Sequence, residues 1–205
     1  VNKDGIDDII IGGLYASPIW RNKAGVAWIV FGRNSWPSEI NLDSLSISDG
    51  IFLIGGSISD NFGWSVAGVD INNDGFSDVV VGAPYADPNA KTQSGKTYVI
   101  FGRPNSQWKT PIDVANNSWF DGVNGFTITG QFADDYSGSH LSKAGDVNHD
   151  GIQDLIVGAF LSGAIATNAG RSYVIFGHTG HYEPTVSLSD LNGDNGFILS
   201  ASTTS

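Results

Sequence analysis

Short apolar runs of four to seven residues, separated by turns rich in Gly, Asp, Asn and Pro, follow one another along the whole chain. The runs consist mainly of Val, Ile and aromatic residues, which favour β-strands. The run Val79-Val80-Val81 is apolar at successive positions, so we expect a strand that is buried on both faces. No stretch keeps a 3.6-residue apolar period. The pattern predicts an all-β protein.

The apolar runs recur at a nearly fixed interval. The run that begins at Asp78 reappears later in the chain at Asp154 and is already present at Asp8. Two further runs occur three times each: Trp28–Gly32, Tyr98–Gly102 and Tyr173–Gly177, then Gly50–Ile54, Gly125–Thr129 and Gly196–Ser200. A fourth run occurs only twice, after Phe62 and after Tyr136. We therefore expect three four-stranded repeats, A (about 1–56, without its first strand), B (about 57–131) and C (about 132–205).

Four-stranded units that are covered on both faces and repeat along the chain are typical of β-propeller blades. A β-sandwich with coincidental internal similarity is the alternative. Three repeats are too few to close a ring of four to eight blades. We therefore expect the chain to be an interior segment of a longer propeller, and head-to-tail self-assembly of copies is the second interpretation.

An acidic loop precedes the second strand of each repeat. In repeat B it spans residues 70–78 and places Asp, Asn and Asp at loop positions 1, 3 and 5, Gly at position 6 and Asp at position 9. Residues 146–154 keep this pattern, and the first loop enters at position 2 with Val1. Alternating oxygen ligands followed by Gly suit a hard cation, and six to eight oxygens suit calcium better than magnesium. Position 12 is Val in both complete loops, which excludes an EF-hand; plain Asx-Gly turns remain the alternative.

The stretch from Phe62-Gly63, through this loop, to Gly82-Ala83-Pro84 resembles the FG-GAP repeat of integrin α-chain propellers and their bacterial relatives. The resemblance covers essentially the whole chain. It implies blades of a propeller, usually seven-bladed, with about three calcium sites here, the first of them incomplete within this chain. The ligands it implies are side-chain oxygens and, at position 7, backbone carbonyls: Asn2, Asp4, Ile6 and Asp8; Asp70, Asn72, Asp74, Phe76 and Asp78; Asp146, Asn148, Asp150, Ile152 and Asp154.

The chain departs from the family pattern in three ways. Phe-Gly becomes Tyr136-Ser137 in repeat C, and Gly-Ala-Pro changes in repeats A and C to Gly12-Gly13-Leu14 and Gly158-Ala159-Phe160. The interval from one repeat to the next also exceeds the usual repeat length of the family. We expect the extra residues, Pro104–Asn124 in repeat B and their equivalents, to form outward loops.

The composition narrows the range of partners. Lys and Arg total 10 against 21 acidic residues, a formal charge of −11, which argues against nucleic acid and anionic membranes as partners. We expect no membrane insertion, because no apolar run approaches the ~20 residues of a membrane span. The absence of Cys excludes disulfides and zinc–thiolate sites. Nineteen of the 21 acidic residues are Asp, which favours turns and metal loops over helices.

Three weaker signals are given a structural interpretation. The segment Asp190–Gly196 resembles a cation loop but has Gly at positions 4 and 7, so we expect a turn. His178 and His181 lie after a strand with no further ligand candidate beside them, so we expect no metal site there. Asn116-Asn117-Ser118 is a glycosylation sequon, meaningful only in a eukaryotic secretory host.

These observations predict a non-enzymatic calcium-binding module, extracellular or on the cell surface, for adhesion, ligand binding or surface assembly. Its loop faces would meet a protein or glycan ligand. Enzyme signatures such as Gly-x-Ser-x-Gly, His-Glu-x-x-His and the phosphate-binding loop are missing from the sequence. The alternatives are a carbohydrate-binding or carbohydrate-active propeller, lectin-like or lyase-like, and a structural subunit of an extracellular filament.

Overall fold

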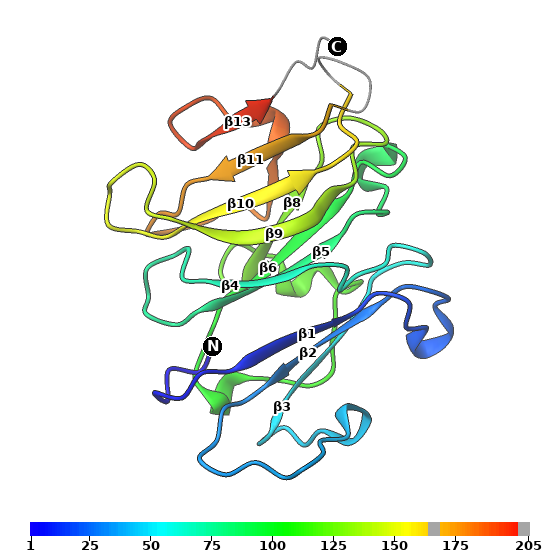
Figure 1. Cartoon of the computed structure of the whole chain (residues 1–205), viewed down its shortest axis with the longest axis vertical. Helices are drawn as coiled ribbons and strands as arrows, with labels where there is room; N and C mark the ends of the chain where they lie inside the picture. The colour runs from blue at the N-terminus through cyan, green and yellow to red at the C-terminus, as the bar shows by residue number, and fades with distance from the viewer. Residues whose placement is uncertain (164–168, 201–205) are drawn as a thin grey trace.

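The computed structural model describes residues 1–163 and 169–200; residues 164–168 and 201–205, which fall in predicted repeat C, lie outside the described residues. The described part folds into three β-sheets and contains no α-helix, which confirms the all-β prediction. Figure 1 shows the sheets stacked face to face along the long axis, with the first sheet at the bottom and the third at the top. They are three adjacent propeller blades, and we call them blades A, B and C.

Each blade is a four-stranded sheet, and blade B has a fifth strand. In spatial order, blade A contains β1 (Ile9–Gly13), β2 (Val26–Val30), β3 (Gly50–Ile54) and β7 (Ile112–Asp113). Blade B contains β4 (Val66–Val69), β5 (Asp78–Ala83), β6 (Lys96–Ile100), β8 (Gly125–Thr129) and β12 (Thr185–Ser187). Blade C contains β9 (Ser137–Gly145), β10 (Asp154–Ala159), β11 (Arg171–Ile175) and β13 (Gly196–Ser200). Short 3₁₀ turns span Pro18–Trp20, Leu42–Ser44, Pro88–Ala90, Asn105–Gln107, Asn117–Trp119 and Leu188–Asp190.

Strand β5 is buried on both faces, as its uninterrupted apolar run predicts. Val79 and Val81 belong to the core between blades A and B, and Val80 belongs to the core between blades B and C. Successive side chains of a strand point to opposite faces, so a strand between two blades needs apolar residues at every position. Burying each such side chain contributes about 1.5–3 kcal/mol. Ile9, at the β1 position that matches Val79, is 47% exposed, because its face points away from blade B.

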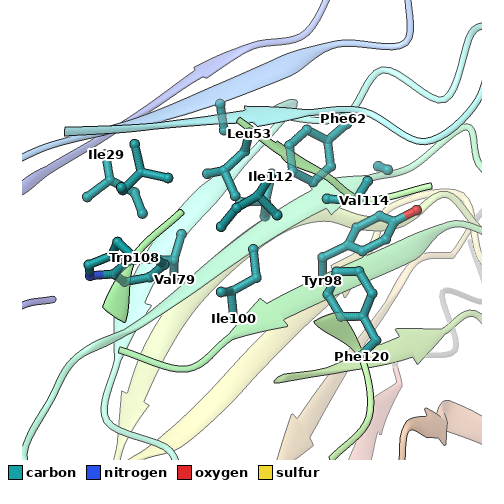
Figure 2. Packing of buried hydrophobic residues seen from close by; sticks show 14 of the residues in the cluster. Ile29, Leu53, Phe62, Val79, Tyr98, Ile100, Trp108, Ile112, Val114 and Phe120 are labelled. Carbon is teal, nitrogen blue, oxygen red and sulfur yellow. The ribbon is translucent and has the colours of Figure 1, made fainter. Parts of the chain in front are cut away.

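Blades A and B are each held to the next repeat by a short parallel strand. Ile112 of β7 pairs with Leu53 of β3, and Val186 of β12 pairs with Ile128 of β8. Figure 2 shows Ile112 between Leu53 of blade A and Ile100 of blade B. The outward-loop expectation for Pro104–Asn124 is therefore wrong, because part of this segment pairs with the preceding blade.

A common spacing anchors these connecting strands. In repeat B the anchors are Trp108, Ile112 and Val114, all of them buried. Repeat C has Tyr182, Val186 and Leu188 at the same spacing, and each of these belongs to or packs against the core between blades B and C. Repeat A has Trp36, Ile40 and Leu42 there, and Trp36 is 44% exposed. The aromatic anchors Trp108 and Tyr182 are therefore buried where a preceding blade is present, and Trp36 is exposed where the described residues contain none.

The structure also corrects the alignment of repeat C. The amide of Phe62 donates to the carbonyl of Ala24 at 2.9 Å, and the amide of Ser137 donates to the carbonyl of Ser94 at 3.0 Å in the matching place. Left-handed backbone conformations at Asn61 and Gly63 likewise match those at Tyr136 and Gly138. The predicted match of Phe-Gly to Tyr136-Ser137 is thus wrong by one residue: Ser137-Gly138 is the equivalent pair.

Candidate metal centres

The three acidic loops lie on one side of the stack of blades, at the left of Figure 1, each at the start of β1, β5 or β10. Their backbones turn in the same way. Position 4 is left-handed in all three copies and is occupied by Lys3, Asn73 and His149, with φ of 60°, 57° and 62°. Position 6 is Gly throughout, with φ from 82° to 89°, a conformation that other residues adopt only with strain. The sequence pattern thus produces one loop geometry three times.

Side-chain oxygens fold inward onto the backbone of each loop. In the repeat B loop the Asp74 amide donates to Oδ1 of Asp70 and to Oδ1 of Asn72, both at 3.1 Å. The Asp150 amide makes the same two bonds in repeat C, at 3.0 and 3.2 Å. In all three loops the side-chain amide of the position-3 Asn donates to the carboxylate at position 5, at 2.8–3.0 Å. The predicted ligands at positions 1, 3 and 5 are therefore brought together in each complete loop.

The aspartate at position 9, at the end of the acidic loop, links position 2 of the loop to the glycine that follows the third strand. Asp78 is fully buried, and its Oδ2 accepts from the Ile71 amide at 2.9 Å while its Oδ1 accepts from the Gly102 amide at 2.9 Å. Asp154 accepts in the same way from Val147 and Gly177, at 2.7 and 2.9 Å. Asp8 accepts from the Val1 nitrogen and from Gly32, both at 2.8 Å.

Sequence reasoning missed the glycine that follows the third strand of each repeat. A Cβ on Gly102 would stand 2.5 Å from the carbonyl oxygen of Ser77, at loop position 8. Gly32 and Gly177 meet the equivalent carbonyl oxygens at 2.5 and 2.3 Å. The repeated Phe-Gly after this strand was visible in the sequence, and its glycine is required because the acidic loop packs directly against its backbone.

Electrostatics around Asp78 favour a positive charge. Burial raises the pKa of Asp78 to about 8, against the effect of its two backbone hydrogen bonds, and the carboxylates of Asp74 and Asp70 raise it further. A cation beside these three carboxylates would offset both the burial and the mutual repulsion.

The donor set fits a hard cation. The predicted ligands of each complete loop are carboxylate, amide and backbone carbonyl oxygens, which is the set that calcium prefers, and His149 at position 4 of the repeat C loop is outside this set. Within residues 1–163 and 169–200, no three His, Cys, Asp or Glu side chains are gathered closely enough to hold a metal ion by themselves. Binding would therefore draw on the Asn and carbonyl oxygens and require the carboxylates at positions 1 and 5 to turn away from their backbone partners.

Neighbouring loops contact one another. Lys3 donates from Nζ to the carbonyl of Asp74 at 3.2 Å and lies over the Phe76 ring, 5.1 Å from its centre. The Asp70 amide donates to Oε1 of Gln153 at 3.2 Å. The loops of blades A and B, and of blades B and C, are thus linked directly.

Two of the weaker sequence signals, the Asp190–Gly196 segment and His178, make structural contacts. The Asp190–Gly196 segment is a turn in which Asn192 Oδ1 accepts from the Asp194 amide at 2.9 Å. The His178 ring stacks on Tyr182 at 3.9 Å, and Tyr182 donates from its hydroxyl to the Ile71 carbonyl at 2.7 Å. In the part of the chain that the structure describes, no helix is long and apolar enough to cross a membrane.

The FG-GAP repeat model matches residues 62–100 and 137–175, and both matches begin at the Phe62 and Ser137 positions that the structure makes equivalent. The chain belongs to the FG-GAP repeat family. Its curated FG-GAP relatives include integrin alpha-8 of Mus musculus, 30% identical over 85% of this chain, and integrin alpha pat-2 of Caenorhabditis elegans, 30% identical over 95%. Phosphatidylinositol-glycan-specific phospholipase D of Bos taurus is 31% identical over 78%. The chain spans 15%, 15% and 17% of these proteins, respectively.

Proposed function

We propose that this chain is a calcium-binding propeller module that acts outside the cell in adhesion or ligand binding. The observation that carries the proposal is the acidic loop built in the same way three times, with an oxygen atom at every predicted ligand position. Similarity to integrin alpha chains supports an adhesive role.

Calcium would be held in each complete loop by the side chains at positions 1, 3, 5 and 9 and by the carbonyl at position 7. These are Asp70, Asn72, Asp74, Phe76 and Asp78 in blade B, and Asp146, Asn148, Asp150, Ile152 and Asp154 in blade C. Asn2, Asp4, Ile6 and Asp8 would form the third, incomplete site. The ion supplies charge neutralisation. The chain's own residues supply the rigid frame, because the position-9 aspartate ties the loop to two strands.

The functional consequence is stiffness. At a calcium concentration of ~100 times the dissociation constant, each site adds about 2.7 kcal/mol to the free energy of unfolding. Calcium-bound acidic loops would hold the blades in one conformation. The loops at the other end of the blades would then meet a protein or glycan ligand in a fixed arrangement. Low conformational entropy in the free module favours binding.

Thermal unfolding with and without calcium tests the proposal. Removing calcium with a chelator should lower the melting temperature by about 5–10 °C per saturated site, for a chain of this size. Asp74→Ala should remove part of the calcium-dependent shift, whereas Asp190→Asn, in the turn outside the three loops, should leave it intact. A melting temperature that ignores calcium would count against metal binding.

The anchors of repeat A, with Trp36 exposed and Ile40 and Leu42 half-buried, suggest a partner blade. Trp36, Ile40 and Leu42 repeat the spacing that holds β7 and β12 on the preceding blade. We propose that they receive the outer strand of another FG-GAP blade. Sedimentation velocity would then show self-association that Trp36→Ala weakens, and a monomer at every concentration would argue against pairing between copies.

A further inference from the structure

A cavity of about 610 Å³ opens beside the connection between β6 and β8 of blade B. It is lined by Arg103 and Lys109, by the indole rings of Trp108 and Trp119, and by neutral side chains such as Asn116 and Asn124. Among the described residues that line it, none is acidic. Two cations with no acid beside them in this cavity contrast with the formal charge of −11 of the whole chain.

The guanidinium of Arg103 is fixed in position but not neutralised. Its Nε donates to the Phe101 carbonyl at 3.1 Å, and its terminal nitrogens donate to Oδ1 and the backbone carbonyl of Asn124 at 2.8 and 2.9 Å. It lies 5.2 and 5.0 Å from the ring centres of Trp108 and Trp119. Three of its five N–H donors are thereby used by neutral acceptors, and two remain for a ligand.

The other repeats show that this charge is a feature of blade B and not of the fold. Repeat A has Arg33 at the matching position, and there Asp49 neutralises it at 3.2 Å. Asp49 and Asn124 are equivalent, because their carbonyls accept from the amides of Phe31 and Phe101 at 2.8 and 3.0 Å. Within residues 1–163 and 169–200, neither Arg103 nor Lys109 has an acidic partner within 4.0 Å.

Repeat C supports the same conclusion at two positions. His178 takes the place of Arg103, and Glu183 takes the place of Lys109, directly after the aromatic anchor Tyr182. The anchors and the short strand form in all the same. The fold therefore does not require a cation at either position.

Burial lowers the pKa of Arg103, and the carboxylates of Asp121, Asp78 and Asp74 raise it from a distance. The Asp121 carboxylate is engaged elsewhere. It accepts from the amides of Val123 and Asn124 and from the Asn124 side chain, at 2.7–2.9 Å. The positive charge of the cavity thus stays available to a ligand.

We propose that this cavity binds a uronic acid unit of an acidic oligosaccharide. A planar carboxylate matches the two free N–H donors of Arg103, and Lys109 adds a second charge. The apolar face of a sugar ring suits the partly buried indole of Trp119, and the neutral amides suit its hydroxyl groups. The site uses none of the proposed calcium ligands, so the failure of one proposal leaves the other testable.

Calorimetric titration with trigalacturonic acid, against maltotriose as the neutral probe, tests the proposal. We expect saturable binding of trigalacturonic acid and at least tenfold weaker binding of maltotriose. Asn124→Asp introduces the residue of repeat A and should neutralise Arg103. Lys109→Glu introduces the residue of repeat C. Each should weaken trigalacturonic acid binding at least tenfold. Lys109→Glu should change the melting temperature little, because repeat C has Glu183 at this position. Asn124→Asp also removes the hydrogen bond from the Asn124 side chain to Asp121, so its binding is measured well below its own melting temperature.

Lys23→Glu is the matched control. It makes the same change in net charge as Lys109→Glu, on an exposed lysine of repeat A, and should change the affinity less than twofold. Equal affinity for the two sugars, no binding of trigalacturonic acid at millimolar concentration, or equal losses in Lys23→Glu and Lys109→Glu would each overturn the proposal.

Discussion

Asp154→Asn separates two roles of the position-9 aspartate. One is to hold the loop in place by accepting two backbone hydrogen bonds, and the other is to bind calcium. The fully buried Asp154 carboxylate accepts from two backbone amides, Val147 at 2.7 Å and Gly177 at 2.9 Å. Asparagine has one acceptor oxygen, so one of these amides would face a second donor. An unsatisfied buried donor costs about 1–3 kcal/mol, and bonds to a charged acceptor are the stronger class. We expect a loss of about 2–4 kcal/mol in chelator, before calcium contributes.

Asp150→Asn is the control on the same loop. Asp150 is exposed, and its Oδ1 accepts from the Ile152 amide at 2.8 Å, a bond that an asparagine oxygen can keep. The bond from the Asn148 side chain to Oδ2 is lost, but it is exposed and water can replace it. In chelator this variant should change the free energy of unfolding by about 0.5 kcal/mol or less. In calcium both variants should lose the stabilisation of one site, up to about 2.7 kcal/mol at saturation.

Urea unfolding of both variants, with chelator and with calcium, measures these terms. Equal stability of Asp154→Asn and Asp150→Asn in chelator would refute the fastening role. A full calcium response in both would refute their role as ligands.

Three further predictions concern other parts of the fold. Burial, with help from Asp87, raises the pKa of Asp60 from 3.8 to about 6. The folded state therefore binds this proton more tightly than the unfolded chain, and Asp60 lowers the free energy of unfolding as the pH rises from 3.8 to about 6. Burial also raises the pKa of Asp78, so Asp60→Asn should keep part of the pH dependence and should reduce the fall between pH 4 and 7, measured in urea melts, by roughly 1–3 kcal/mol. Gly102→Ala should cost about 1–3 kcal/mol, read from the urea midpoint, because its Cβ meets a carbonyl oxygen at 2.5 Å. Trp108→Ala should cost about 3–5 kcal/mol and Trp36→Ala about 0.5 or less in the same assay, since only the first is buried.

Much of the fold could be predicted because it is encoded locally and repeated. The three successive apolar residues Val79–Val81 predict burial on both faces of the strand. The spacing of Asp, Asn and Gly in the loop 70–78 predicts its turn. Both patterns occur three times in the chain, which supports the prediction of repeated blades.

What could not be predicted depends on partners distant in the sequence. The strand β7 is very short, and only its pairing with β3, which lies far earlier in the chain, makes it a strand. The equivalence of Ser137 and Phe62 could not be predicted, because the two side chains differ while the backbone hydrogen bonds are the same. The unneutralised charge of Arg103 depends on Asn124, which stands where repeat A has Asp, and appears only when the repeats are superposed through their hydrogen bonds.

The central claim is that the acidic loops hold calcium, and equilibrium dialysis of the chain in millimolar calcium, with bound metal counted by atomic emission, tests it most directly. We predict at least two bound ions per chain, falling by one in Asp150→Asn. Less than one bound ion per chain, or the same count in Asp150→Asn, would contradict the claim.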